Sequence, residues 1–192
     1  MLLCITGLHA SGKSHFCKNV AIKFGFKRVN KKKLLENICK NEMGNEVDWL
    51  NWYRVEYNKN PIKMTKKIIE ELPLNENIIL DAVHSYKEWK IIQSFVPDAL
   101  MIAVTTPQNI RASRWEINDE IKDLKRIQYW HSDYKGKNGC LLTQISWTFN
   151  GAAPDEVNEI SFNSFLDYLK TNNLVNETND GPKILTNRRK GD

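Results

Sequence analysis

The sequence predicts an α/β domain in three layers, with helices on both faces of a parallel sheet. Apolar runs at residues 2–5, 78–80 and 99–105 have the length and composition of buried strands. Segments whose apolar residues recur at helical spacing separate these runs, so strands and helices alternate along the chain. The 192 residues suffice for one such domain with a full hydrophobic core, which we expect at residues 1–172.

A glycine-rich loop follows the first strand. Residues 7–14 read Gly-Leu-His-Ala-Ser-Gly-Lys-Ser and fit the pattern G-x-x-x-x-G-K-[ST] without a mismatch. The glycines let the backbone curl so that its N–H groups point inward, and the next helix directs its positive end at the same place. We expect this loop to bind phosphate groups, with Lys13 at the terminal phosphates and Ser14 holding Mg²⁺. The residues expected to contact the nucleotide here are Gly7, His9, Ala10, Ser11, Gly12, Lys13 and Ser14.

The chain from the loop to residue 73 should form a helix, a short strand and three further helices. Gly25 should end the first helix, and residues 26–30 should form the second strand. Lysines at residues 31–33 open the next helix, which should end near Gly44. These lysines are either a solvated face or part of the entrance for a phosphorylated acceptor. The last of these helices should begin with Pro61.

The segment 48–57 is rich in tryptophan and tyrosine. Asp48 is a typical N-cap, so this segment should be a helix. Its aromatic side chains either pack in the core or form a stacking platform for an acceptor base, with Arg54 on the acceptor's phosphate. The sequence leaves both interpretations open.

The third strand ends in a carboxylate. Residues 78–80 are apolar and Asp81 follows them directly, which is the form of a Walker B strand. In a parallel sheet Asp81 would emerge beside the glycine-rich loop, where it could orient Mg²⁺ or its waters. Ser85 and Glu88 then form a capping box at the start of another helix.

Two arginines follow the fourth strand. Pro107 should lie at the start of a helix on which Arg111 and Arg114, three residues apart, share a face. Ligands of α/β proteins lie at the carboxyl ends of the strands, so these arginines could clamp the oxygens of a transferring phosphoryl group. The alternative is a solvated helix face. Basic residues follow further along at positions 122, 125 and 126.

The last third of the chain gives weaker signals. The polar, glycine-containing residues 131–139 predict a mobile loop, and the apolar spacing in residues 140–149 favours a helix. Residues 157–161 should form a short last strand, and residues 162–169 the face of a closing helix. Residues 173–192 are polar and are predicted to be a disordered tail.

Composition limits the possible partners. The net charge of +5 suits anionic small molecules and does not by itself require nucleic acid, although it permits it. No apolar run approaches the length that spans a membrane. The four cysteines have no C-x-x-C spacing and the four histidines no metal-ligand spacing. We therefore expect a cytoplasmic protein with reduced thiols and no structural metal.

Four motifs together resemble one enzyme family. The loop at 7–14 is the strongest, and residues 78–88 resemble a hydrophobic strand followed by D-G-V-R-S-x-x-E. Residues 107–114 resemble P-x-x-x-R-x-x-R, and residues 153–159 loosely resemble A-D-x-x-x-x-N. These are motifs of the P-loop kinases related to nucleoside monophosphate kinases and dephospho-CoA kinase, the adenylate kinase-like group, and the resemblance covers roughly residues 1–170.

The resemblance implies a five-stranded parallel sheet in the order 2-3-1-4-5. It also implies acceptor-binding helices inserted at about residues 31–72 and a helical lid at about residues 111–139 that closes on ATP. Together with the residues themselves, it predicts a catalytic set, with Arg111 also contacting ATP and with Ser14 and Asp81 as the Mg²⁺ residues. The catalytic residues expected are Lys13, Asp81, Arg111 and Arg114.

The chain departs from the family pattern on the acceptor side. Asn30 stands where relatives often have an acidic residue, which serves as acceptor-side base in dephospho-CoA kinases. His84 stands where the D-G-V-R-S stretch has its arginine. We expect the acceptor between the segments that follow the second and third strands. The candidate acceptor residues are Asn30, Lys32, Trp52, Arg54 and His84.

These observations predict an ATP- and Mg²⁺-dependent small-molecule kinase. It would transfer the γ-phosphoryl group to a nucleotide or nucleotide-like acceptor, of the nucleoside monophosphate or dephospho-CoA type. One alternative is a polynucleotide or RNA-end kinase, which the positive charge and the aromatic segment favour, although no long basic-aromatic stripe is evident. The other is a nucleotide-binding regulatory protein without turnover, which the departures at Asn30 and His84 suggest.

Overall fold

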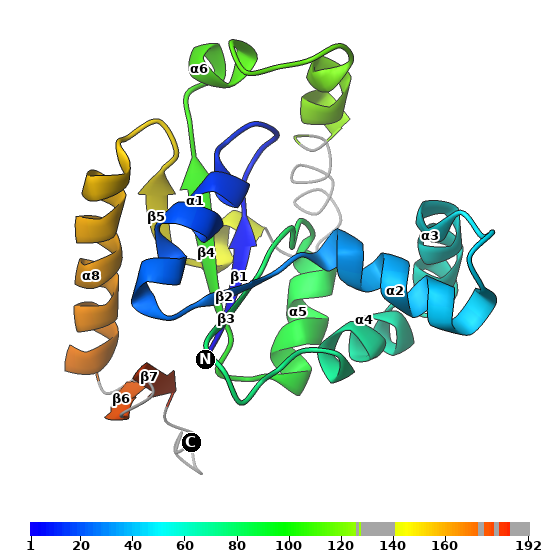
Figure 1. Cartoon of the computed structure of the whole chain (residues 1–192), viewed down its shortest axis with the longest axis horizontal. Helices are drawn as coiled ribbons and strands as arrows, with labels where there is room; N and C mark the ends of the chain where they lie inside the picture. Colours follow the sequence, from blue (N-terminus) through cyan, green and yellow to red (C-terminus); the bar gives the residue numbers. More distant parts are fainter. Residues whose placement is uncertain (126, 128–140, 173–174, 179–180, 185–192) are drawn as a thin grey trace.

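The computed structural model describes residues 1–125, 127, 141–172, 175–178 and 181–184. Within them, five parallel strands form one sheet in the order β2-β3-β1-β4-β5 (Figure 1). This confirms the predicted fold class and strand order. The strands are β1 (Leu2–Thr6), β2 (Lys27–Val29), β3 (Ile78–Leu80), β4 (Leu100–Thr105) and β5 (Ile145–Asn150).

The central strand β1 explains why both faces of the sheet are covered. Successive side chains of a strand point to opposite faces. Leu2 and Cys4 belong to one buried cluster, whereas Leu3 and Ile5 belong to the other. Because all five residues of β1 are buried, the strand reads as a continuous apolar run rather than an alternating one.

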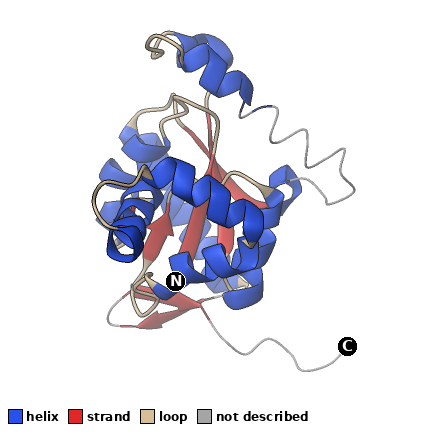
Figure 2. Ribbon diagram, turned by 90° about the vertical axis from the view of Figure 1, so that its right-hand side faces the viewer, coloured by secondary structure: helices blue, strands red, loops and turns tan. Residues whose placement is uncertain are grey.

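Helices lie on both faces of the sheet (Figures 1 and 2). The cluster around Leu2 is completed by residues from α2, α3, α4 and α5, and the cluster around Leu3 by residues from α1 and α8. The helices are α1 (Lys13–Asn19), α2 (Lys31–Met43), α3 (Trp49–Lys59), α4 (Pro61–Glu70), α5 (Tyr86–Phe95), α6 (Gln108–Ala112) and α8 (Asp155–Thr171), with 3₁₀ turns η1 (Ala21–Phe24) and η2 (Leu141–Gln144).

The predicted helix boundaries follow their capping residues. Asp48 accepts a hydrogen bond from the Leu50 amide at 3.0 Å, and Ser85 accepts one from the Glu88 amide at 3.1 Å. Gly25 ends the first helical segment with φ of 78°, although that segment is α1 followed by η1 rather than one continuous helix.

The helix expected at residues 140–149 is wrong. Leu141–Gln144 is a 3₁₀ turn, and Ile145–Asn150 is strand β5, which pairs with β4. Along β5 the odd-numbered residues are the more buried ones, and Phe149 is 1% exposed. This alternation of buried and exposed residues fits a half-buried edge strand. The apolar residues of this short segment fit helical spacing as well, and the pairing with β4 decides for the strand.

The strand expected at residues 157–161 is also wrong, because these residues lie inside α8. Asp155 and Glu156 occupy the first turn of that helix, and Asn158 donates to the Asn150 carbonyl at 2.9 Å. The tail expected to be disordered from residue 173 contains an antiparallel pair, β6 (Val175–Thr178) and β7 (Gly181–Ile184). Residues 185–192 lie outside the described part of the chain.

The helix predicted after β4 is interrupted. α6 ends at Ala112, Asn118 has φ of 71°, and a second helical stretch occupies residues 119–125. The predicted mobile loop at 131–139 and the later part of the predicted lid lie outside the described residues. Among the described helices, none has the length and apolar composition needed to cross a membrane.

Candidate active site

The glycine-rich loop joins β1 to α1, at the carboxyl end of the central strand. Gly7 has φ of 153°, and a Cβ atom there would lie 2.4 Å from the Val104 carbonyl oxygen and 2.7 Å from Ser11 Oγ. Only glycine fits such a close approach. Gly12 precedes α1 in the left-handed region, with φ of 90°. Glycine at these two positions therefore allows the loop to take this shape.

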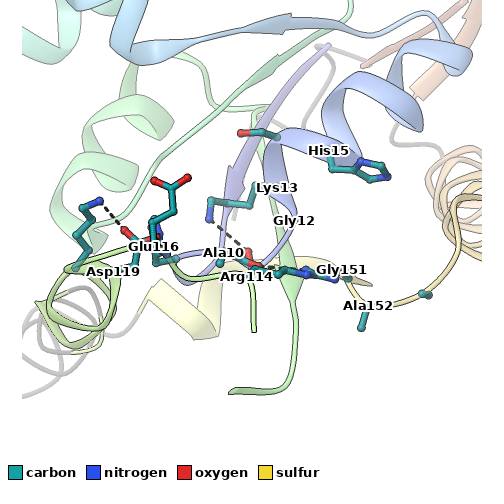
Figure 3. Close-up of a pocket in the computed structure, with 14 residues that line it drawn as sticks. Ala10, Gly12, Lys13, His15, Arg114, Glu116, Asp119, Gly151 and Ala152 are labelled. Atoms are coloured by element: carbon teal, nitrogen blue, oxygen red, sulfur yellow. Dashed lines mark hydrogen bonds and ion pairs between the residues drawn. The ribbon is translucent and has the colours of Figure 1, made fainter. Parts of the chain in front are cut away.

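Lys13 lies inside this loop. Its Nζ donates to the carbonyl oxygens of Gly7 at 2.9 Å and Leu8 at 2.7 Å. It also lies 3.3 Å from Ser11 Oγ (Figure 3). The ammonium group is thus held over the loop, where a bound phosphate would meet it.

A cleft of about 770 Å³ opens over the loop. This volume is in the range of sites for small molecules and cofactors. Its walls are loop residues 9–14, Arg114 and Lys122 from the segment after β4, and residues 151–153 from the β5–α8 turn (Figure 3). The loop residues and Arg114 were predicted from the sequence as site residues, whereas residues 151–153 were not.

Gly151 explains how that wall approaches the loop. A Cβ atom on this residue would lie 1.8 Å from the Ser11 carbonyl oxygen. The Gly151 amide donates to the Thr105 carbonyl at 2.8 Å, which ties the turn to the end of β4. A small residue directly after an apolar strand was the available sequence signal, but it becomes specific only once β5 is recognised.

Arg111 and Arg114 do not act on one helical face. Arg114 is exposed at the cleft, where Nη1 donates to the Ala10 carbonyl at 3.2 Å and Nη2 to the Gly151 carbonyl at 3.1 Å. Arg111 is 3% exposed and lies outside the cleft lining. The reason is that α6 ends at Ala112, so Arg114 is no longer on a helix.

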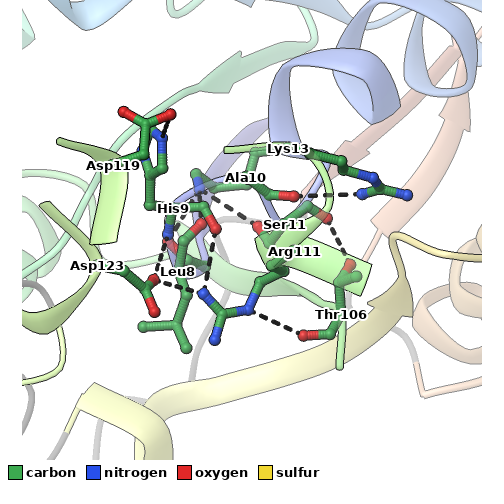
Figure 4. Close-up of polar contacts among 11 residues, drawn as sticks. Leu8, His9, Ala10, Ser11, Lys13, Thr106, Arg111, Asp119 and Asp123 are labelled. Atoms are coloured by element: carbon green, nitrogen blue, oxygen red, sulfur yellow. Dashed lines mark hydrogen bonds and ion pairs between the residues drawn. The ribbon is translucent and has the colours of Figure 1, made fainter. Parts of the chain in front are cut away.

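Arg111 instead contacts the backbone of the glycine-rich loop (Figure 4). It forms a buried ion pair with Asp123, and Nη1 also donates to the His9 carbonyl at 3.3 Å. The same Asp123 oxygen accepts from the His9 amide at 3.2 Å. One residue of the glycine-rich loop is therefore fixed at both its amide and its carbonyl.

Asp119 places a negative charge at the cleft wall. It lies 2.6 Å from Lys122 Nζ and 2.9 Å from His9 Nε2, and it accepts from the Glu116 amide at 2.9 Å. The hydrogen bond from Lys122 first, then the Glu116 amide and His9, hold the pKa of Asp119 well below its usual range. Neither Asp119 nor Asp123 was identified from the sequence.

One arginine contacts both Asp81 and Ser14, the two residues predicted to hold Mg²⁺. Arg28, on the edge strand β2, is ion-paired with Asp81 and donates from Nη2 to Ser14 Oγ at 3.1 Å. The Lys31 amide donates to the other Asp81 oxygen at 3.2 Å. Arg28 was missed because the predicted strand order does not show that the Arg28 side chain reaches from β2 to Asp81 and Ser14.

The five candidate acceptor residues are not brought together. Trp52 is 7% exposed in the core, so its packing interpretation is confirmed, whereas Arg54 is exposed on α3. Lys32 lies at the surface, with Nζ 3.6 Å from Glu36 and 5.8 Å from the centre of the Trp49 ring. None of the five lines the 770 Å³ cleft.

Asn30 and His84 lie after β2 and β3, at the expected edge of the sheet. Asn30 caps α2 by accepting from the Lys33 amide at 3.2 Å. It also lines a second groove of about 450 Å³ beside β2 and α2, together with Arg28 and Lys33. His84 is half-buried in the turn before α5.

Several solved structures share this arrangement of elements. A gluconokinase from Sinorhizobium meliloti 1021 matches with a TM-score of 0.55 at 15% identity, over 88% of this chain and 93% of its own. A shikimate kinase from Acinetobacter baumannii, in complex with shikimate, matches with a TM-score of 0.54 at 12% identity, over 90% and 94%. A shikimate kinase from Aquifex aeolicus gives 0.50 at 15% identity, over 90% and 98%. No protein-family model matches the chain, and no curated protein is significantly similar to it in sequence.

The chain has the fold of the P-loop small-molecule kinases. Because no more than 15% of residues are identical, the likeness concerns the fold and leaves the acceptor open. In this P-loop kinase fold, the loop with Lys13 fits a polyphosphate. The surroundings of Asp81 do not fit a metal ion, because Arg28 and the Lys31 amide direct N–H groups at its two oxygens.

Proposed function

We propose that this protein is an ATP-dependent kinase that phosphorylates a small molecule. The observation that carries the proposal is the ammonium group of Lys13, held inside a glycine-rich loop at the floor of a 770 Å³ cleft. Such a loop suits a nucleoside triphosphate, whose phosphates accept hydrogen bonds from backbone N–H groups and from lysine.

The residues around the cleft have separate roles in this proposal. Lys13 and the amides of residues 12–14 bind the β- and γ-phosphates. Arg114, which lines the same cleft, neutralises the charge that develops on the transferred group, since a guanidinium can meet two oxygens at once. Arg111 acts indirectly: it holds the loop in place by contacting the backbone of His9 and does not line the cleft.

Mg²⁺ accompanies ATP in such enzymes and offsets phosphate charge. Of the two residues predicted to hold it, Ser14 lies at the loop, and its hydroxyl oxygen, which accepts from Arg28 Nη2 at 3.1 Å, keeps a second lone pair for the ion. Asp81 is occupied by Arg28, so we assign no step to a metal ion through Asp81.

For the acceptor, we retain the nucleotide-like class that the sequence predicts. The kinases with similar structures are named for shikimate and gluconate, which widens the class to small hydroxylated acids. Support for an acceptor on the β2 side comes from the 450 Å³ groove, which Arg28, Asn30 and Lys33 share.

The test is ADP release from ATP over a panel of acceptors, compared in the parent and Lys13→Ala proteins. The panel contains nucleoside monophosphates, dephospho-CoA, shikimate, gluconate and 5′-hydroxyl oligonucleotides. We expect one small molecule to raise ADP release well above the basal rate, and Lys13→Ala to abolish the increase. Stimulation by oligonucleotides alone would favour a nucleic-acid-end kinase, and ATP binding without any stimulation would favour a regulatory protein.

A further inference from the structure

Arg28 crosses from the edge of the sheet to the glycine-rich loop. Its strand, β2, is separated from β1 by β3. Arg28 Nε donates to Asp81 Oδ2 at 2.8 Å, Nη2 is ion-paired with the same oxygen, and Nη2 also donates to Ser14 Oγ at 3.1 Å. One guanidinium therefore links the two residues that the sequence assigned to Mg²⁺.

Both oxygens of the Asp81 carboxylate accept hydrogen bonds from the protein. Oδ2 accepts from Arg28, and Oδ1 accepts from the Lys31 amide at 3.2 Å. The Lys31 side chain is itself in a buried ion pair with Glu88 and donates to the Ala82 carbonyl at 3.4 Å. Lys31 thus fixes the turn that carries Asp81. This places the Asp81 carboxylate where it accepts from the Arg28 guanidinium.

A metal ion at Asp81 would have to displace this arginine. Arginine is charged at every relevant pH and presents its N–H groups in a rigid fork that matches phosphate oxygens. The Arg28 side chain is 20% exposed, and Nη1 makes no hydrogen bond within the described part of the chain. It can therefore meet a phosphate oxygen while Nε and Nη2 remain on Asp81.

We propose that Arg28 is a phosphate-binding residue beside Ser14, and that Asp81 is its positioning residue rather than a metal residue. The proposal rests on the proposed function, since it concerns the same nucleotide site. In this proposal the positive charge beside Ser14, on the β2 side of the loop, is the Arg28 guanidinium and not a metal ion held by Asp81. Ser14 lines the 770 Å³ cleft and Arg28 lines the 450 Å³ groove, so the contact between these two residues joins the two cavities.

The experiment measures binding of a fluorescent ATP analogue, first in EDTA and then in a Mg²⁺ titration. The variants are Arg28→Gln, Arg28→Lys and Asp81→Asn. Lys27→Gln is the matched control, because it removes the same charge from the neighbouring residue of β2, whose side chain is 67% exposed and paired with Glu76.

We expect Arg28→Gln to weaken metal-free binding at least fivefold, and Arg28→Lys to weaken it by a smaller factor because lysine keeps the charge but loses the fork. Lys27→Gln should stay within twofold of the parent. Asp81→Asn should weaken metal-free binding as well, while the Mg²⁺ concentration for half-maximal effect stays within twofold. If Arg28→Gln does not fold, Arg28→Lys and Asp81→Asn decide the question by the same criteria.

Two results would overturn the proposal and leave the proposed function intact. One is parent-like metal-free binding by Arg28→Gln and Arg28→Lys. The other is a raised Mg²⁺ requirement in Asp81→Asn with a lowered one in Arg28→Gln, which would make Asp81 a metal residue that Arg28 blocks. If the parent binds no ATP with or without Mg²⁺, the proposed function fails and this proposal fails with it.

Discussion

Arg111 and Arg114 contact adjacent carbonyl groups of the same loop, but their surroundings differ. Arg111 and Asp123 are about equally buried, with side chains 4% and 3% exposed, whereas Arg114 is exposed at the cleft. Breaking a buried ion pair leaves one uncompensated charge in the interior, and breaking an exposed contact costs little stability. Substitution of Arg111 should therefore mainly lower the stability of the fold, and substitution of Arg114 should mainly weaken nucleotide binding.

We predict that Arg111→Gln lowers the free energy of unfolding by about 3–5 kcal/mol, because it leaves Asp123 buried without its cation. Urea denaturation followed by circular dichroism measures this. The matched variant Arg114→Gln should change stability by less than about 1 kcal/mol and weaken ATP binding. Equal stability of the two variants would show that the Arg111–Asp123 pair does not hold the loop.

Asp119 gives a pH-dependent prediction. Its pKa is lowered in the folded state by the hydrogen bonds from Lys122, the Glu116 amide and His9, so its ionised form contributes stability above the unfolded pKa. That contribution is lost only as pH falls through the lowered pKa. We expect an NMR titration of the Asp119 carboxyl carbon to show a midpoint well below 3.8, and Lys122→Met to raise it. A midpoint at or above the ordinary value would contradict the network.

At the level of elements, the turn between β5 and α8 forms one wall of the cleft. It approaches the loop so closely that Gly151 leaves no room for a side chain against Ser11. Two hydrogen bonds fix this turn. The Gly151 amide donates to the Thr105 carbonyl of β4, and the Asn158 side chain of α8 donates to the Asn150 carbonyl. Displacing this turn should therefore move the loop.

We predict that Gly151→Ala weakens ATP binding at least tenfold, about 1.4 kcal/mol, because the new methyl group would force the turn and the loop apart. Isothermal titration calorimetry measures the affinity. Gly44→Ala is the control: φ is 90° there and nothing lies within 4 Å, so it costs backbone strain without touching the site. Similar ATP affinity in both variants would mean that the close approach at Gly151 has no role in binding.

These elements also show which signals the sequence carried. Capping residues such as Asp48 and Ser85 predicted helix starts, because a cap depends only on its own turn. β5 was predicted as a helix and the start of α8 as a strand. Over such short segments the apolar spacing fits both a helix and a strand, and for β5 only the pairing with β4 decides. Arg114 was predicted on a helix that in fact ends two residues earlier.

At the scale of the whole molecule, the fold was predictable and the site only in part. The loop at residues 7–14 is a local pattern, so its place after β1 followed from the sequence alone. Arg28, Asp123 and Gly151 reach the site through side-chain and backbone contacts between segments far apart in the sequence, which no short pattern encodes. The candidate acceptor residues were chosen by position along the chain, and the fold places Trp52 in the core and Lys32 at the surface.

Calorimetric titration of ATP into the parent, Lys13→Ala and Lys18→Ala proteins tests whether the loop at residues 7–14 binds a nucleotide. Both substitutions remove one charge from α1, but Lys18 is exposed at the far end of the helix, whereas Lys13 lies inside the loop. We predict that the parent and Lys18→Ala bind ATP with affinities within twofold of each other. Lys13→Ala should bind at least tenfold more weakly, about 1.4 kcal/mol, because the phosphates lose a fixed cation. Equal affinities in all three proteins, or no ATP binding by the parent, would contradict the assignment of this loop as a nucleotide site.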